Sequence, residues 1–310
     1  MGKKVSIIGA GKVGSTTAHL LAIKGLCDIV LVNRTAGVAQ GVALDIMESM
    51  PIEKSEVSVI GTGDYSLISG SDVVVVTAGA QRKEGMSRDD LLKVNAQIVA
   101  DAAVQIKKYA PESIVIVVSN PLDAMAYIMK KKTNFERNRV IGMAGALDSA
   151  RLCTFIAEEE KASVNDVYTI ILGSHGDSMV PILSRTTVKG KAVQNLIEKG
   201  RLETIVARAR DGGAEIIKLE GSSAFYAPAS SVVSMVDSII NDKKRIIPCS
   251  VYLEGEYGIS GIFIGVPVEL GKKGMDKVVA IEMTEDERRM LSDSAEKIRV
   301  LIEQVGSLNV

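Results

Sequence analysis

The sequence predicts an α/β protein in which a doubly wound parallel sheet is followed by a second, α+β domain. Short β-rich runs alternate with helical runs over the first half of the chain, an order that gives parallel strands joined by helices. The β-rich runs are nearly all Val and Ile, such as VVVV at 73–76, as in strands covered on both faces. The pattern changes near residue 143, so we expect a first domain at 1–143 and a second at 144–310.

Each element of the first domain follows from this alternation. We expect the strands at 3–9, 28–33, 55–61, 71–79 and 112–121, all of them buried, and the helices at about 12–24, 37–49 and 88–109. After residues 139–145 we expect a helix, a longer strand at 166–174, polar segments, and a C-terminal helix from about Glu285.

Composition limits the classes of function. The chain has 310 residues, of which 46% are hydrophobic, enough to fill two compact domains. Its 37 basic and 38 acidic residues nearly cancel and form no long block, so we expect neither a nucleic-acid nor a membrane partner. The apolar runs are far shorter than the ~18 residues of a membrane helix, and no segment resembles a secretion signal. We therefore expect a cytoplasmic protein.

The cysteines point away from a disulfide framework or a metal site. Cys27, Cys153 and Cys249 are scattered and form no CxxC pair. An odd number of isolated cysteines is typical of a reducing compartment. We therefore expect no metal.

The first chemical signal is the glycine pattern GAGKVG after the first predicted strand. Gly9 permits a tight turn, Gly11 lets the backbone approach a pyrophosphate, and Gly14 packs the helix on the strand. The N-terminus of the following helix then faces the phosphates. The pattern predicts a Rossmann-type dinucleotide site, whose residues in this loop are Gly9, Ala10, Gly11, Lys12, Val13 and Gly14.

The end of the second strand bears on which dinucleotide binds. An acidic residue here usually bonds the ribose 2′-hydroxyl of NAD and repels a 2′-phosphate. This chain has Asn33 instead, followed by Arg34 and Thr35, which can supply a cation and a hydroxyl donor to that phosphate. We expect a dual NAD(P) protein that prefers NADP. The alternative is an NAD protein in which Arg34 points into solvent and Asn33 bonds the ribose.

The second chemical signal is His175 in LGSHGDSMVP. The chain has only two histidines, and His19, within the first predicted helix, is interpreted as a packing or surface residue. The segment LDSAR places Asp148 and Arg151 on one helical face.

Further polar residues follow the predicted strands. Arg82 and Arg88 lie in a glycine-containing stretch after a parallel strand, where ligand-covering loops are expected. Asn120 follows another strand, where Pro121 is expected to keep it extended. Each of these groups could instead be an ordinary solvated charge or loop residue.

Together the motifs resemble the lactate/malate dehydrogenase family. GAGKVG, RKEGMSR, SNPLD, LDSAR and GSHGDSMVP occur in that family's order and spacing, over nearly the whole chain from Val5 to the C-terminal helix. The resemblance implies that His175 exchanges a proton with the substrate hydroxyl and that Asp148 orients its imidazole.

The resemblance also implies the binding residues. Arg151 would grip the substrate carboxylate, Arg88 would polarise the carbonyl, and Asn120 would hold substrate and nicotinamide. The remaining positions expected near the cofactor are Thr77, Ala78, Gly79, Asn95, Val118, Ser119 and Asn120.

The chemistry agrees with this assignment. Removing a hydride from a 2-hydroxy acid needs a base for the hydroxyl proton, and histidine titrates near neutrality. A guanidinium forms a two-pronged pair with a planar carboxylate.

Substrate choice turns on Arg82. Enzymes of the family's malate branch have arginine at this loop position, and lactate enzymes usually have glutamine, so Arg82 favours a dicarboxylate such as oxaloacetate. Ala224 points the same way, because lactate enzymes often have threonine there. If Arg82 does not read the distal carboxylate, Lys83 is the nearest candidate.

Three alternatives stay open. The first is a lactate dehydrogenase acting on pyruvate. The second is a short-chain dehydrogenase, because Tyr127 and Lys131 fit YxxxK, although its glycine spacing differs. The third is a non-catalytic dinucleotide sensor, which would not need His175 or the arginines. By analogy with the family we expect a homodimer or homotetramer.

Overall fold

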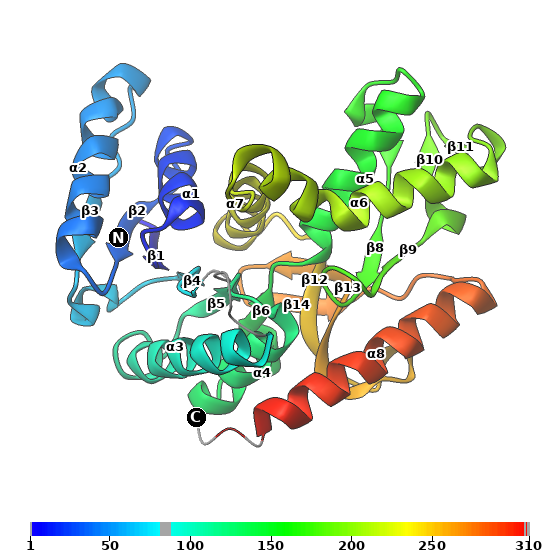
Figure 1. Cartoon of the computed structure of the whole chain (residues 1–310). Helices are drawn as coiled ribbons and strands as arrows, with labels where there is room; N and C mark the ends of the chain where they lie inside the picture. The colour runs from blue at the N-terminus through cyan, green and yellow to red at the C-terminus, as the bar shows by residue number, and fades with distance from the viewer. Residues whose placement is uncertain (1, 81–87, 307, 309–310) are drawn as a thin grey trace.

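The computed structural model describes residues 2–80, 88–306 and 308, with the backbone only for residues 88 and 89. Its core is one large mixed sheet with helices on both faces (Figure 1). The first half of this sheet is parallel and has the order β3-β2-β1-β4-β5-β6. These strands are β1 (Lys4–Ile8), β2 (Asp28–Val32), β3 (Val59–Thr62), β4 (Val73–Val76), β5 (Ile114–Val117) and β6 (Val140–Gly142).

The parallel strands are covered on both faces, as the Val-rich runs predict. Val73 and Val75 of β4 pack into one core with helices α1, α2 and α7, whereas Val74 and Val76 pack into the other with α3 and α4. This alternation follows from the two-residue period of a strand. The helices are α1 (Lys12–Ile23), α2 (Ala36–Glu53), α3 (Arg88–Tyr109), α4 (Leu122–Thr133) and α7 (Tyr226–Ile240).

The second half of the chain extends the same sheet with antiparallel strands. A long hairpin of β12 and β13 pairs with β6 on one side and with β8 on the other, and β9 and β14 complete the sheet. A small separate sheet has the order β11-β10-β7. The strands are β7 (Val167–Tyr168), β8 (Ile171–Gly173), β9 (Met179–Pro181), β10 (Thr187–Val188), β11 (Lys191–Ala192), β12 (Arg245–Glu254), β13 (Ser260–Gly271) and β14 (Gly274–Val278).

Three more long helices surround these strands: α5 (Gly145–Glu159), α6 (Lys199–Glu220) and α8 (Glu285–Gly306). Short 3-10 helices occupy several connections: η1 (Tyr65–Ile68), η2 (Arg137–Arg139), η3 (Val164–Asp166), η4 (Leu183–Arg185), η5 (Val193–Asn195) and η6 (Glu256–Gly258). The predicted fold class, a Rossmann-type parallel sheet with a second α+β domain, is confirmed.

Several elements differ from the prediction. β3 is the edge strand and leaves Ile60 48% exposed, so it is not buried on both faces. The strand predicted at 166–174 is broken between β7 and β8, where the Thr169 hydroxyl donates to the Ser149 carbonyl at 2.8 Å. The helix predicted to end at Ser49 continues to Glu53 and contains Pro51 in its last turn.

The part predicted as polar segments is mostly regular structure. It contains α6, α7 and the β12–β13 hairpin, and α4 was not predicted either. Pro121 directly precedes α4, Asp123 lies in its first turn, and lysines fill its last turn, so the charges complement the helix dipole. Among the described residues, no helix is both long and apolar enough to cross a membrane.

Candidate active site

The strand order reverses between β1 and β4, and this places the candidate site. In open α/β sheets, ligands bind outside the carboxyl ends of the strands at such a switch point. The GAGKVG loop follows β1 there, residues 77–79 follow β4, and residues 118–120 follow β5. The residues of these three loops, which are predicted to bind the cofactor, therefore meet at the carboxyl ends of the parallel strands.

The three glycines of GAGKVG have distinct packing roles. Gly9 has φ +112°, and a Cβ there would lie 2.7 Å from Thr77 Oγ1. A Cβ on Gly14 would lie 1.9 Å from the Gly9 carbonyl oxygen, so α1 packs on β1 only with glycine at 14. A Cβ on Gly11 would meet nothing within 4 Å. The chain thus leaves open space where the second glycine is expected to face a pyrophosphate, so the loop fits a dinucleotide.

The loops after β4 and β5 are tied together. The Ser119 hydroxyl donates to the Ala78 carbonyl at 2.6 Å. Asn95 from α3 is buried, accepts from the Ala80 N–H at 2.7 Å and donates to the Asn120 carbonyl at 2.7 Å. The Asn95 side chain therefore holds together the loops that follow β4 and β5, next to the proposed cofactor site.

Asn120 itself lies on the surface of this edge. Its side chain is exposed, and the Asn120–Pro121 peptide bond is cis. Val118 is half-buried, and its N–H donates to the Val76 carbonyl at 2.9 Å. Asn120 is thus free to face a ligand while its backbone is held.

The end of β2 presents the residues predicted to distinguish the two dinucleotides. The Asn33 amide donates to the Thr35 carbonyl at 3.2 Å. Thr35 precedes α2 without capping it through its side chain. Arg34 is exposed, and within the described part of the chain no hydrogen bond or ion pair holds it. The side chains of Arg34 and Thr35 are therefore available to a ligand at the N-terminus of α2.

Lys12 links the glycine loop to the second half of the chain. Its ammonium donates to Ser222 Oγ at 2.8 Å, lies 3.5 Å from Glu220, and sits 5.0 Å from the Phe225 ring centroid. Ala10 is buried and Val13 half-buried, so these neighbours support the loop rather than project from it.

His175 lies just after β8, between Gly173 at φ +81° and Gly176 at φ +94°. Its Nδ1 is 2.9 Å from Asp148 Oδ2, a carboxylate that is only 2% exposed at the start of α5. Because Nδ1 faces Asp148, Nε2 is the ring nitrogen left for a ligand. The structure thus brings together two residues that are 27 positions apart.

Arg151 extends this cluster from the same face of α5. Its Nη1 lies 3.5 Å from Asp148 Oδ1, and its side chain is 14% exposed. In the described chain, Asp148 is the one carboxylate paired with this guanidinium, at a distance too long for a strong bond. A largely buried guanidinium with unused donors is suited to bind a planar carboxylate.

Two glycines of α6 make room for Arg151. A Cβ on Gly212 would lie 3.3 Å from Arg151 Cδ, and a Cβ on Gly213 would lie 3.6 Å from Nη2. Glycine within a helix lowers its stability, so the pair indicates close approach.

The electrostatics of the cluster favour a protonated imidazole. Burial lowers the pKa of His175, but the charge of Asp148 and its hydrogen bond outweigh burial and raise the pKa above its usual value of 6.5. Burial lowers the pKa of Arg151, opposed by the charge of Asp148. His175 is therefore poised to hold and release a proton near neutrality.

Other predicted residues fall outside this description. Arg82 lies outside the described residues, and so does the side chain of Arg88, which begins α3. Among the residues described, no three His, Cys, Asp or Glu side chains are grouped as metal ligands would be.

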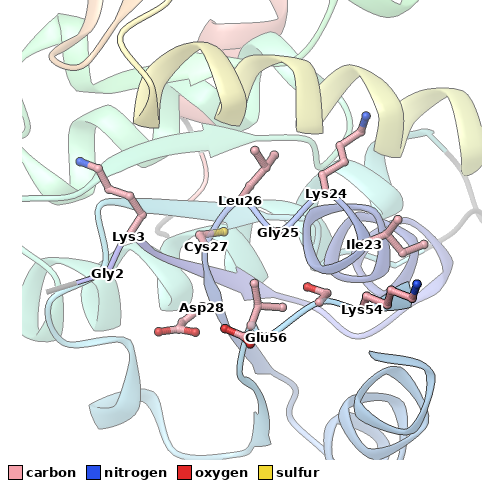
Figure 2. Close-up of a pocket in the computed structure, with 12 residues that line it drawn as sticks. Gly2, Lys3, Ile23, Lys24, Gly25, Leu26, Cys27, Asp28, Lys54 and Glu56 are labelled. Carbon is pink, nitrogen blue, oxygen red and sulfur yellow. The ribbon is translucent and has the colours of Figure 1, made fainter. Parts of the chain in front are cut away.

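A surface pocket lies elsewhere. It has a volume of about 580 Å³ and is lined by residues such as Lys24, Cys27, Asp28, Lys54 and Glu56 (Figure 2). These residues surround the start of β2, at the opposite end of the strands from the glycine loop. Its open form and mixed charges give no support for a catalytic site.

The fold and the site together define a dinucleotide-binding oxidoreductase. Two family models match the chain: residues 3–142 fit the lactate/malate dehydrogenase NAD-binding domain, and residues 145–308 fit the alpha/beta C-terminal domain of the same family. The chain belongs to the lactate/malate dehydrogenase family.

Individual relatives agree. A malate dehydrogenase of Heliobacterium modesticaldum is 50% identical over 98% of this chain and 99% of its own length. The apo malate dehydrogenase of Picrophilus torridus superposes with a TM-score of 0.96 at 42% identity, covering 99% of this chain and 98% of that one. A Cryptosporidium parvum lactate dehydrogenase, solved with lactic acid and nicotinamide adenine dinucleotide, has a TM-score of 0.95 at 36% identity, covering 99% of both chains.

Sequence reasoning missed two features of the site. Asp123, within the quoted SNPLD motif, is buried behind His175 and bonds Ser174. Gly212 and Gly213 approach Arg151. Adjacent glycines in a helical pattern were the available signal for the second feature, whereas nothing local indicated the first.

Proposed function

We propose that the chain catalyses reversible hydride transfer between malate and oxaloacetate with a nicotinamide dinucleotide. The observation that carries this proposal is the buried cluster of His175, Asp148 and Arg151. The names of the relatives at about half identity support malate over lactate. A sensor without catalysis would not need this cluster.

The proposed chemistry assigns a role to each residue. Malate oxidation removes a hydride from C2 and the proton of its hydroxyl group. The nicotinamide ring would accept the hydride. His175 Nε2 takes the hydroxyl proton, and Asp148 stabilises the resulting imidazolium. Arg151 holds the carboxylate next to C2, while Asn120 and Arg88 orient the substrate oxygen.

Steady-state kinetics test the activity. With oxaloacetate and with pyruvate, the parent should strongly prefer oxaloacetate. His175→Asn should bind the cofactor nearly normally and transfer hydride roughly 10²–10⁴ times more slowly. Equal use of pyruvate would favour lactate dehydrogenase, and no turnover of either would favour a sensor.

We propose that Arg82 reads the distal carboxylate of the dicarboxylate substrate. Arg82→Gln should weaken use of oxaloacetate on the order of 2–5 kcal/mol and raise relative use of pyruvate. Lys83→Gln is the matched variant. If it alone changes the selectivity, Lys83 has the role.

We propose that the enzyme uses both dinucleotides and prefers NADP. Three features support this: Asn33 in place of an acid, the exposed Arg34, and Thr35 with a hydroxyl that does not cap α2. Within the described residues, a 2′-phosphate at the end of β2 would meet Asn33 in place of an acid and the exposed cation of Arg34.

The test of cofactor choice is the ratio of kcat/KM for NADPH over NADH. In Asn33→Asp this ratio should fall tenfold or more, about 1.4 kcal/mol. A parent ratio well below one that the new carboxylate does not move would support the NAD alternative, with Arg34 in solvent.

We also propose a homodimer or homotetramer in the cytoplasm, with the domain boundary at 143–144. The oligomer is supported by apolar side chains exposed on α2 and β3, among them Leu44, Ile52 and Ile60. The boundary is supported by the turn from β6 into α5.

A further inference from the structure

A second carboxylate lies behind His175. Asp123 in the first turn of α4 is 2% exposed. Its Oδ2 accepts from the Ser174 hydroxyl and its Oδ1 from the Ser250 hydroxyl, both at 2.6 Å. A buried carboxylate is costly unless it is hydrogen-bonded, so this arrangement is specific and built into the fold.

Asp123 joins two loops of the site. It lies three residues after Asn120, on the helix that follows the β5 loop. Ser174, its partner, directly precedes His175. The N–H of Ser174 donates to Ser294 Oγ of α8 at 2.9 Å, so the Ser174 residue is held from two sides. The orientation of His175 therefore depends on both α4 and α8.

The strand behind Asp123 is shaped for this contact. Ser250 of β12 is fully buried and pairs with Gly142 of β6. A Cβ on Gly142 would lie 2.9 Å from the Ser250 Cβ. Gly142 therefore gives Ser250 the room from which it reaches Asp123.

We infer that Asp123 is a positioning residue for the proton-transfer step: as a carboxylate it fixes Ser174, and its negative charge stabilises the imidazolium of His175. This inference rests on the proposed function of His175. The charged side chains that act on His175 are Asp148 and Arg151 from α5 and Asp123 from α4. Among the residues that the structure describes, Asp123 is the acidic group of α4 that acts on His175.

The charge of Asp123 should change the pKa of His175 in a direction that can be measured. Burial raises the pKa of Asp123, opposed by the hydrogen bonds from Ser174 and Ser250 and by the nearby imidazole. In turn, the charge of Asp123 helps raise the pKa of His175. Asp123→Asn preserves the shape and can keep both serine contacts, since a hydroxyl both donates and accepts. This change therefore removes mainly the charge.

The experiment is an NMR titration of the histidine imidazoles in the full-length protein. Only His19 and His175 are present, so His19→Gln assigns the signals. In Asp123→Asn the pKa of His175 should fall. The control Asp293→Asn, which removes an exposed carboxylate of α8, should not change it. This readout needs no substrate, so it distinguishes failure of the inference from failure of the proposed activity.

Kinetics supply the second readout. Asp123→Asn should lower kcat for oxaloacetate reduction on the order of tenfold, as is typical when a group that orients a functional side chain is removed. The affinity for NADPH should not change. Ser174→Ala, which keeps the charge, should lower kcat while the pKa of His175 stays raised. If Asp123→Asn does not fold, Ser174→Ala still tests the inference. An unchanged His175 titration in Asp123→Asn, or unchanged kcat in Ser174→Ala, would overturn the inference.

Discussion

Asp148 serves two side chains with its two oxygens. Oδ2 lies 2.9 Å from the His175 ring, and Oδ1 lies 3.5 Å from Arg151. One buried carboxylate therefore contacts both His175, the proposed proton carrier, and Arg151, the proposed binder of the substrate carboxylate. Its removal should be visible in how the reaction depends on pH.

Asp148→Asn should lower the pKa of His175, because the charge and hydrogen bond that raise it are lost or weakened. In the proposed mechanism, oxaloacetate reduction needs the imidazolium of His175, so the reaction is fastest below this pKa and declines as pH rises through it. The decline should therefore begin at lower pH in the variant, with kcat lowered at least about tenfold at neutral pH. The pH profile of kcat/KM measures this, and an unmoved profile would separate Asp148 from the proton.

For individual residues, the sequence predicts contacts between neighbours in the chain better than contacts between residues far apart in it. The Asp148–Arg151 pair is local, so helical spacing predicts it. The contact of His175 with Asp148 came from the family resemblance. The partners of Asp123 lie 51 and 127 residues away, and no local pattern reveals them. The roles of the site residues stay predictions.

Helix α1 shows how one element serves both fold and ligand. Gly14 faces the Gly9 carbonyl and permits helix–strand packing, whereas Gly11 has φ −79° and open space around it. The packing role of Gly14 and the proposed binding role of Gly11 thus fall to two glycines three residues apart.

Gly14→Ala should destabilise the ligand-free protein by roughly 1–3 kcal/mol, because α1 must move away from β1. Gly11→Ala should leave the unfolding temperature unchanged but weaken NADPH binding, because its methyl group would occupy the space proposed for pyrophosphate. Thermal unfolding and NADPH fluorescence titration measure the two effects. Normal NADPH affinity in Gly11→Ala would place the phosphates elsewhere.

The sequence predicts best those helices and strands whose residues show a clear local pattern of apolar and polar side chains. Helix α3 occupies the predicted residues 88–109, and strands β1, β2, β4 and β5 lie within their predicted ranges. The run at 166–174 is apolar enough for one strand, yet contacts with α5 divide it. Helix α6 was not predicted, because its adjacent glycines, Gly212 and Gly213, are unfavourable in helices.

At the scale of the whole molecule, helix α2 presents two large apolar side chains to solvent. Leu44 is 61% exposed and Ile52 is 80% exposed. Strongly exposed apolar side chains on one helix are typical of an interface.

Leu44→Glu should therefore reduce the mass measured by light scattering from that of a dimer or tetramer toward that of one 33.0 kDa chain. Val300→Glu is the control, because Val300 is similarly exposed, at 56%, on the distant helix α8. An unchanged mass in Leu44→Glu would remove α2 from the interface.

The glycines beside Arg151 set stability against activity. Each glycine lowers the intrinsic stability of a helix by about 1 kcal/mol relative to alanine, so α6 is weaker than its length allows. Alanine at 213 would strengthen the helix, but its Cβ would lie 3.6 Å from Nη2 of the Arg151 guanidinium. A laboratory selection for heat resistance alone would therefore favour this alanine and, given the proposed role of Arg151, yield a more heat-stable protein that binds its substrate less well.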